Sequence, residues 1–355
     1  MSATWGKKIQ YTIFGESHGK GIGITIAGLP PGLEIDLGEI TSEMARRAPG
    51  RSPLATPRSE KDNFTIWSGF INGKTTGTPL CAIIENSDQK SADYEAMEQK
   101  FRPGHADYSG YIKYNGFNDI RGGGHFSGRL TAPLVLAGAI AKQILSQKGI
   151  LIGAHIQRIG SVSAPQFDAV TLPPTLLTQL HHQEFAVIDT HIGEQMQDCI
   201  LSAKSAGDSV GGIIETAVLH LPAGLGDPFF DSLESTLAHL LFSIPAIKGV
   251  EFGAGFDFAE LRGSIANDAI YRQNGVTKTI TNHNGGILGG ISNGMPLIFR
   301  VVIKPTPSIN VEQHTINGKG ENVKIIVGGR HDPCIVPRAV PVVEAVAAMA
   351  ILDVL

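Results

Sequence analysis

The sequence predicts a single domain, residues 1–355, built from two similar halves of strands and helices at roughly 1–150 and 200–355. Three short motifs recur in the same order. Both copies of the first motif are followed by a similar segment, LPPGL from residue 29 and LPAGL from residue 221. Two diverged copies of one fused unit leave this kind of self-similarity. The pairs are GESHG (15–19) with GDSVG (207–211), TGTPLCAII (76–84) with NGMPLIFRVV (293–302), and GGGHFSG (122–128) with GGRHDP (328–333).

The elements of each half follow from these phrases. KIQYTIF before GESHG and GIGITIAG after it both have the apolar, β-branched pattern of short strands, so this turn joins two strands. Both glycine phrases lead into apolar runs of helical length, LTAPLVLAGAIAKQIL (130–145) and RAVPVVEAVAAMAILDVL (338–355). Each half should therefore begin with strands and end with a long apolar helix.

Composition limits the class of protein. The 355 residues are 42% hydrophobic and 17% charged, which is typical of a globular chain. Cys81, Cys199 and Cys334 are too few and too scattered for a disulfide framework, so we expect a reducing compartment and a cytoplasmic location. The N-terminal residues have no apolar signal segment and no window approaches a membrane span. A net charge of −4 argues against nucleic-acid binding.

Ser17 raises a question of function, because GESHG fits the G-x-S-x-G pattern of a hydrolase nucleophile elbow. That elbow joins a strand to a helix, whereas a strand is expected here on both sides. Ser17 is then a turn residue that bonds nearby backbone. The second copy keeps the serine but has Val210 in place of His18, which makes His18 the better candidate for chemistry. A serine hydrolase using Ser17 and a non-catalytic flavin- or anion-binding protein remain alternatives.

Other polar clusters also precede turns or helices. His105 follows a Pro-Gly turn with Arg102 and Asp107 nearby, and the glycine-rich turn at 122–128 precedes a helix, where backbone N–H groups favour an anion. The last phrase offers either an anion site or a structural salt bridge from Arg330, His331, Asp332 and Arg338. Residues 46–61 form a local basic excess, either a solvated loop or an anion site, with Arg46, Arg47, Arg51, Arg58 and Lys61 against Glu60.

Metal and nucleotide motifs are not found in the sequence. His181 and His182 lack the HExxH or HxH spacing that places two ligands on one ion, so we predict no metal site. There is also no GxxxxGK[ST] loop and no GxGxxG fingerprint with a following acid, which argues against a Rossmann-type site.

Taken together in this order, GESHG, FRPGHADYSG, GDSVGG, LPAGLG, NGGILGGISNG, KPTPS and GRHDPC make the chain resemble the chorismate synthases from residue 15 to its C-terminus. The resemblance implies an α+β fold, a β-α-β sandwich of two pseudo-symmetric halves with helices between antiparallel sheets, assembled as a homotetramer. It implies a shikimate-pathway lyase of aromatic amino acid biosynthesis that converts 5-enolpyruvylshikimate 3-phosphate to chorismate and phosphate. The reaction is an anti 1,4-elimination that requires reduced FMN without net redox change, and some members reduce the flavin with NADPH.

The resemblance also implies roles for single residues. His18 would assist the departing phosphate, His105 would lie beside the reduced flavin, and Asp332 with Ser17 and Ser127 would relay the proton taken from the ring. Substrate or NADP anions would meet Arg46, Arg47, Arg51, Arg129 and Arg338. FMN would contact His125, Phe126, Ser127, Ala246, Gly289, Lys304, Pro305, Thr306, Pro307, Ser308 and Arg330.

The chain departs from the family pattern at two places. Many relatives have Arg-Ser-Ser where this chain has His125, Phe126 and Ser127, so its side-chain contacts to flavin there should differ. Many also have an arginine at the position of Pro53. Either Arg51 substitutes for that arginine or one anion contact is missing.

Overall fold

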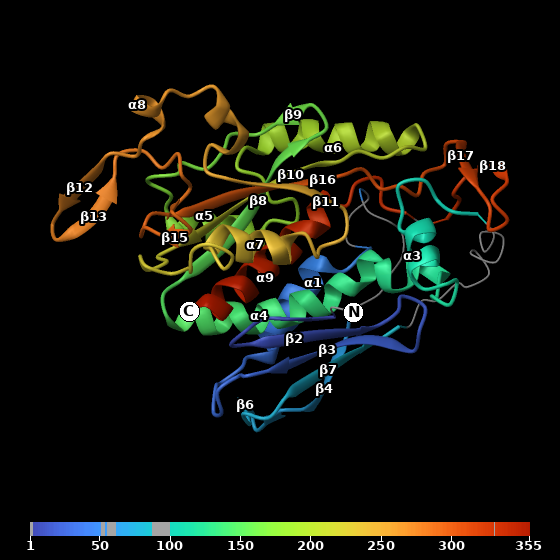
Figure 1. The fold of residues 1–355 in the computed structure, drawn as a ribbon, viewed down its shortest axis with the longest axis horizontal. Coiled ribbons are helices and arrows are strands. Elements are labelled where there is room, and N and C mark those ends of the chain that lie inside the picture. The colour runs from blue at the N-terminus through green and yellow to red at the C-terminus, as the bar shows by residue number, and fades with distance from the viewer. Residues whose placement is uncertain (1–2, 51–53, 55–61, 87–99, 330) are drawn as a thin grey trace.

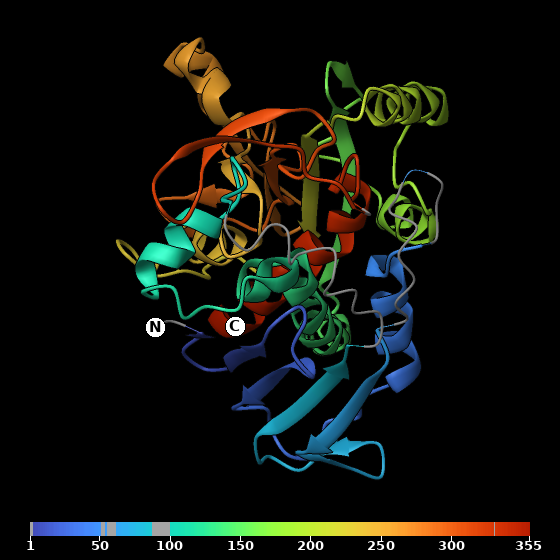
Figure 2. The same ribbon diagram turned by 90° about the vertical axis from the view of Figure 1, so that its right-hand side faces the viewer.

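The computed structural model describes residues 3–50, 54, 62–86, 100–329 and 331–355. It contains two main sheets of five strands each, and a layer of helices lies between them (Figure 1, Figure 2). The strand pairs that these residues form in the two sheets are antiparallel. The α+β sandwich predicted from the sequence is therefore confirmed.

The first sheet contains both strands that flank the GESHG turn. β2 and β3 pair antiparallel, with Gly15 opposite Ile22. The turn therefore joins strand to strand as predicted, and the strand-to-helix context of a nucleophile elbow is not present at Ser17. In sheet order the strands are β1 (Thr4–Trp5), β2 (Gln10–Gly15), β3 (Gly21–Ala27), β7 (Leu80–Glu85) and β4 (Phe64–Ser68).

The second sheet is formed by the later part of the chain and lies on the other side of the helices (Figure 1). In sheet order its strands are β11 (Ile247–Phe252), β16 (Leu297–Ile303), β10 (Gly212–Leu219), β8 (Leu151–Ile159) and β9 (Val162–Ser163). Two-stranded hairpins complete the strands: β5 (Phe70–Ile71) with β6 (Lys74–Thr75), β12 (Ile270–Gln273) with β13 (Val276–Thr279), β14 (Ile287–Leu288) with β15 (Ile291–Ser292), and β17 (Gln313–Ile316) with β18 (Asn322–Ile325).

The helices divide into an inner layer and outer elements. The inner ones are α1 (Leu37–Arg47), α4 (Thr131–Gln147), α7 (Leu233–Leu241) and α9 (Val336–Val354). The outer ones are α3 (Asp107–Lys113), α5 (Pro174–His182), α6 (Thr190–Ser205) and α8 (Gly263–Ala266). Short 3₁₀ turns are η1 (Arg121–Phe126), η2 (Gly128–Leu130) and η3 (Gly255–Ala259). Within the described ranges, no helix combines the length and apolarity needed to span a bilayer.

The two halves share one connection pattern. The first runs β2-β3-α1-β4-β7-α4 and the second runs β8-β10-α7-β11-β16-α9. Corresponding strands have corresponding neighbours, since β2-β3-β7-β4 in one sheet matches β8-β10-β16-β11 in the other. The second copy therefore starts with β8 at Leu151, and α5 and α6 are inserted between its first two strands.

Burial between the two sheets explains why α4 and α9 are mainly apolar. Both helices lie between the sheets and cross closely enough that a methyl group on Gly138 would lie 2.2 Å from Cβ of Ala345. A helix with little solvent-facing surface buries most of its circumference, so most of its side chains are apolar, and buried charges such as Lys142 and Glu344 are paired. In contrast, α1 is amphipathic and starts at an N-cap, where the Asp36 carboxylate accepts a bond from the Gly38 N–H at 2.6 Å.

Candidate active site

The GESHG turn and the glycine-rich turn at 122–128 lie against each other, although the chain separates them by about a hundred residues. The Ser17 N–H donates to the Gly124 carbonyl at 3.1 Å, and Nδ1 of His125 lies 3.0 Å from the Gly15 carbonyl oxygen. The Asn86 amide donates to two further carbonyls of the GESHG turn. These bonds hold the backbone of the turn that carries Ser17 and His18.

The glycine-rich turn contacts both predicted histidines. A methyl group on Gly122 would lie 2.0 Å from Nδ1 of His18, and one on Gly123 would lie 3.2 Å from Nε2 of His105. Both glycines have positive φ, 60° and 84°, a region that other residues rarely adopt. The structure therefore brings His18 and His105 to one turn. His18 is buried and His105 is half-buried.

His105 belongs to a compact ion cluster at the start of α3. Its Nδ1 lies 2.5 Å from Oδ1 of Asp107, and Arg102 holds the same carboxylate through Nε at 2.7 Å and Nη2 at 2.8 Å. Burial raises the pKa of Asp107, but hydrogen bonds from Arg102 and His105 outweigh it and hold the pKa below its usual range. Asp107 is therefore ionised at neutral pH.

The loop predicted to bind FMN, residues 304–308, touches both the His105 loop and the strand end at Ala246. The Lys304 N–H donates to the Ala246 carbonyl at 3.0 Å, and its Nζ donates to the Gly104 carbonyl. Nη1 of Arg102 donates to Oγ of Ser308 at 3.3 Å. Two of the predicted flavin-binding positions, Lys304 and Ser308, thus contact the His105 segment, and Ala246 contacts Lys304.

Chemical features of this loop suit an anionic, hydrogen-bonding ligand. Burial and the nearby charge of Lys248 lower the pKa of Lys304, so two ammonium groups lie close together there. Within the loop, Oγ1 of Thr306 is buried and makes no hydrogen bond to a described residue, and the same holds for Oγ of Ser17 in the separate GESHG turn. A ligand with phosphate or carbonyl oxygens would satisfy these groups.

Three predicted anion-binding arginines form a second cluster. Arg47 donates from Nε to Asp62 at 2.9 Å, and Nη1 of Arg129 donates to the same carboxylate. Burial raises the pKa of Asp62, but the charges of Arg47 and Arg129 outweigh burial and hold the pKa below its usual value. Arg338 donates from Nη1 to Asp332 at 2.6 Å and from Nε to the Arg47 carbonyl at 3.1 Å. The interpretation of this region as a solvated loop is therefore wrong for Arg47.

Arg46 points into a different cluster, between α1, α4 and α9. It donates to Glu344 at 2.6 Å and Glu43 at 2.9 Å, and Lys142 donates to the same two carboxylates at 2.6 and 2.8 Å. The N–H of Ala154 adds a bond to Glu344 at 3.1 Å. The cluster is almost wholly buried, so Arg46 is not a solvated residue either.

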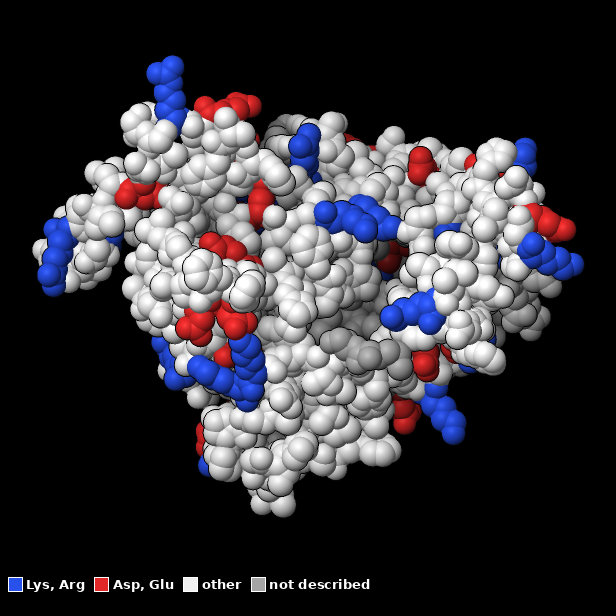
Figure 3. Space-filling view, in the orientation of Figure 1, with Lys and Arg blue, Asp and Glu red and all other residues white. Residues whose placement is uncertain are grey.

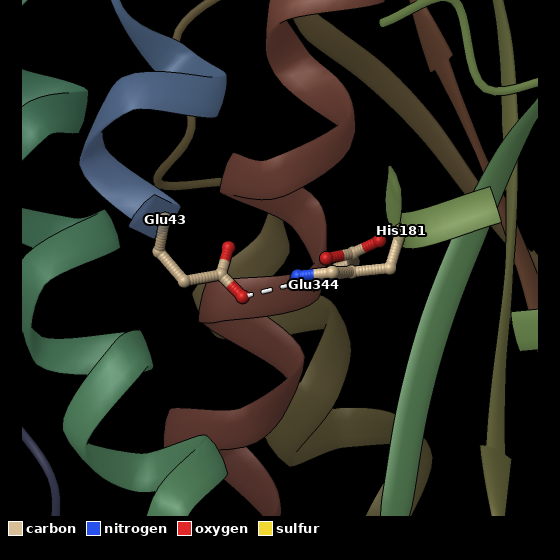
Figure 4. Close-up of side chains that lie close together, drawn as sticks. All are labelled: Glu43, His181 and Glu344. Carbon is tan, nitrogen blue, oxygen red and sulfur yellow. Dashed lines mark ion pairs between the residues drawn. The ribbon is translucent and has the colours of Figure 1, made fainter. Parts of the chain in front are cut away.

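The carboxylates of Glu43 and Glu344 and the ring of His181 lie close enough together to offer three ligands to one metal ion (Figure 4). Nδ1 of His181 lies 3.7 Å from Glu43. Because Arg46 and Lys142 already neutralise the two acids, a cation would have to displace them, and we interpret the cluster as structural. His181 is half-buried against the cluster, whereas His182 is exposed.

The remaining predicted positions divide into several environments. Phe126 packs toward α3, with its ring centroid 6.2 Å from that of Tyr114. Oγ of Ser127 accepts from the Arg129 N–H at 3.3 Å and so caps the short helix before α4. Gly289 lies in the β14–β15 turn, at the opposite end of the molecule from α3 in Figure 1. Arg51 and Arg330, like Pro53, Arg58, Glu60 and Lys61, lie outside the described residues.

A cavity of about 910 Å³ opens beside His105. It lies between the segment 101–109 and the β17–β18 hairpin, and its lining includes Arg102, His314 and Lys324. In the orientation of Figure 1, the surface is hollowed next to α3, with Lys and Arg side chains at the rim (Figure 3). No sequence motif pointed to the hairpin wall of this cavity, because its residues match no recognisable pattern.

Asp62 and Asn86 are the site residues that the sequence reasoning missed. Both orient predicted groups, since Asp62 binds Arg47 and Arg129, and Oδ1 of Asn86 accepts from Nε of Arg129 at 3.1 Å. Asn86 directly follows strand β7, and a polar residue at a strand end is a weak signal that could have pointed to it.

Comparison with known proteins identifies the family. The family model described as chorismate synthase matches residues 9–355. The chorismate synthase of Pyrococcus abyssi is 49% identical over 98% of this chain and 96% of its own length, and that of Dehalococcoides mccartyi strain 195 is 47% identical over 99% and 96%. A solved structure titled "Crystal Structure of Chorismate Synthase" superposes with a TM-score of 0.78 at 31% identity, covering 99% of this chain and 92% of that one. This chain therefore belongs to the chorismate synthase family.

Proposed function

We propose that this chain converts 5-enolpyruvylshikimate 3-phosphate to chorismate and phosphate, as a shikimate-pathway lyase, in the region where the GESHG turn, the glycine-rich turn and the His105 loop meet. Full-length family membership supports the reaction. The observation that supports the location is the contact of adjacent glycines, Gly122 and Gly123, with His18 and His105. Two imidazoles at one turn provide separate proton donors and acceptors for an elimination that breaks one C–O and one C–H bond.

The substrate carries phosphate and carboxylate groups, which require cations. Arg47 and Arg129 share one carboxylate, Asp62, so this group of three has a net charge of +1. Arg338 lies next to it through its bond to the Arg47 carbonyl. We assign anion binding to this cluster, and we assign Arg46 to the buried network with Glu344.

Reduced FMN is the proposed cofactor, and the residues of the 304–308 loop fit it. Lys304 and Lys248 suit its phosphate, while Oγ1 of Thr306 offers a hydrogen bond that no described residue uses. When bound, reduced FMN would supply electron density transiently to the substrate. Around it, the backbone bond from Lys304 to Ala246 holds the loop against the second sheet.

The proton work is assigned to residues of this chain. We assign to His18 the protonation of the departing phosphate, and this assignment is supported by its ring lying against Gly122 near the buried hydroxyl of Ser17. Asp332 is oriented by Arg338 at 2.6 Å and is proposed to receive the proton that leaves the ring. Oγ of Ser17 has a free hydrogen-bonding capacity among the described residues and would assist this transfer rather than act as a nucleophile.

An anaerobic assay tests the proposal. With photoreduced FMN and the enolpyruvyl substrate, we expect phosphate and chorismate to form in equal amounts and turnover to continue on substoichiometric reductant. Oxidation of one flavin per chorismate would contradict the lyase reaction, and flavin binding without phosphate release would favour the non-catalytic alternative. Replacing the photoreductant with NADPH tests whether the chain reduces its own flavin.

A homotetramer in the cytoplasm completes the proposal. Exposed apolar side chains support an assembly, among them Trp67 on β4 and Ile270 and Val276 on the projecting β12–β13 hairpin (Figure 1). Sedimentation equilibrium should give a mass about four times that of one chain. A monomer at micromolar concentration would contradict this part.

A further inference from the structure

We propose that Asp107 is a positioning residue for His105: it fixes Nδ1 of the imidazole as a hydrogen-bond donor and leaves Nε2 as the nitrogen that exchanges a proton in the site. The inference rests on the proposed function, because it deepens the role assigned there to His105. It concerns a residue that acts through another, and its support comes from the ion cluster at the start of α3.

The carboxylate of Asp107 is held more firmly than a surface ion pair. Oδ2 accepts from the Arg102 N–H at 3.0 Å and from Nε at 2.7 Å, and Oδ1 accepts from Nη2 at 2.8 Å. The side chains of Arg102 and Asp107 are 5% and 10% exposed. Bidentate contact with a buried guanidinium fixes both the position and the rotation of a carboxylate.

The direction of the bond to His105 follows from the charge of its partner. The pKa of Asp107 is lowered despite burial, so the carboxylate is ionised and can only accept. Nδ1 of His105, 2.5 Å away, must therefore carry the proton of this bond. Nη2 of Arg102 lies 3.1 Å from Nδ1 and 3.4 Å from Nε2, and it can donate only to a nitrogen without a proton, which under this assignment is Nε2.

Nε2 then remains for the reaction. It faces Gly123, where a methyl group would lie 3.2 Å away, and it borders the cavity beside the loop. Among the described residues, the charged or titratable groups close to the ring include Arg102 and Asp107 on its own segment, Lys304 at the Gly104 carbonyl, and His331. Burial and the charges of Arg102 and His105 lower the pKa of His331. Because Nδ1 donates to Asp107, Nε2 is the nitrogen that gains or loses the proton.

Double substitution separates this role from a structural one. Asp107→Asn should lower kcat by about 10- to 100-fold, since losing the residue that orients a catalytic imidazole is costly. His105→Ala should lower kcat at least as much. If Asp107 acts through His105, adding Asp107→Asn to His105→Ala should change kcat by less than about twofold. Equal losses from Asp107→Asn in both backgrounds would overturn the proposal.

The pH profile gives a second readout. Asp107→Asn should displace the limb of the kcat–pH profile that His105→Ala abolishes, because the ring loses the partner that holds its Nδ1 as a donor. Asp268→Asn is the matched control, since this loop aspartate also accepts bonds from several groups, including Thr281 and Asn284, and lies outside the proposed site. It should leave that limb in place. An unmoved limb in Asp107→Asn would contradict the inference.

A third measurement needs neither flavin nor substrate. Nitrogen-15 NMR of the free protein, with the His105 signals assigned by their loss in His105→Ala, should show Nδ1 protonated in the wild type and a mixture of tautomers in Asp107→Asn. A wild-type tautomer with Nε2 protonated and Nδ1 unprotonated would overturn the proposal. If this result is as expected but the assay forms no chorismate, the proposed function fails and the positioning of His105 stands.

Discussion

The two copies of the glycine-serine turn have the same sequence pattern but opposite uses. In GESHG, Oγ of Ser17 is buried without a hydrogen-bond partner among the described residues, and His18 lies against Gly122. In GDSVG, Oγ of Ser209 donates to the Thr306 carbonyl at 2.7 Å, and the Val210 N–H donates to the Pro333 carbonyl at 2.9 Å. The first turn presents the Ser17 hydroxyl and the His18 ring to the proposed site, whereas the second uses its groups to bond the loops at Thr306 and Pro333.

The comparison teaches how a repeated fold can hold one active site. Both turns bond the backbone of a glycine phrase or its sequel before a long helix, so both retain the structural role. Only the first adds an imidazole. A buried polar group that is left unpaired reduces stability, and such groups are retained where a ligand completes them.

The largest expected difference between the turns concerns the residue after the serine. His18→Ala should lower kcat by roughly 10²-fold or more, the usual loss for a general acid, with an increase in substrate KM. Val210→Ala, its counterpart, should alter stability modestly and kcat little. Steady-state kinetics of both variants, with circular dichroism to check folding, measures this. Equal losses of kcat would mean that the first turn is structural too.

Gly122→Ala should have the next largest effect. The added methyl would overlap the His18 ring, 2.0 Å from Nδ1, and a φ of +60° is unfavourable for alanine by about 1 kcal/mol. Displacing the ring should lower kcat by about 10-fold or more. Gly32→Ala is the control, because its φ is +81° but nothing lies within 4 Å of the added methyl. A similar loss of kcat in the control would assign the effect to backbone strain.

The two serines should give the smallest and most diagnostic contrast. Ser209→Ala removes a hydrogen bond and should reduce the free energy of unfolding by about 1 kcal/mol with little change in kcat. Ser17→Ala removes a hydroxyl that has no described partner, so stability should change less while kcat falls about 10-fold. Urea denaturation and kinetics together test this. The reverse pattern would exchange the roles that we assign to the two turns.

Much of the fold could be predicted because its signals are local. The strands on both sides of GESHG, the long apolar helices α4 and α9, and the repeated order of phrases all follow from short-range periodicity and turn residues. The comparison of the two copies pointed to His18, the Pro-Gly turn pointed to His105, and the family resemblance gave each a role; the structure brings both to one glycine-rich turn.

The charge partners could not be predicted in the same way. Arg46 and Arg47 are adjacent in the sequence, yet Arg46 meets Glu344 across the helix layer and Arg47 meets Asp62 beside the site. Successive residues of a helix point about 100° apart, so neighbours of identical chemistry enter different environments. Composition showed a basic cluster, but it could not separate these two roles.

The sequence by itself determined the repeat, the order of strands and helices, the turns that need glycine, and the side chains able to do the chemistry. Only the tertiary structure decided which of them meet, as when Arg102, His105 and Asp107 join Ser308 from a loop about two hundred residues away. The physical reason is that the conformational preference of the backbone depends on residues nearby in the sequence. The partner of a buried charge, in contrast, depends on which helix, strand or loop packs beside it in the folded core.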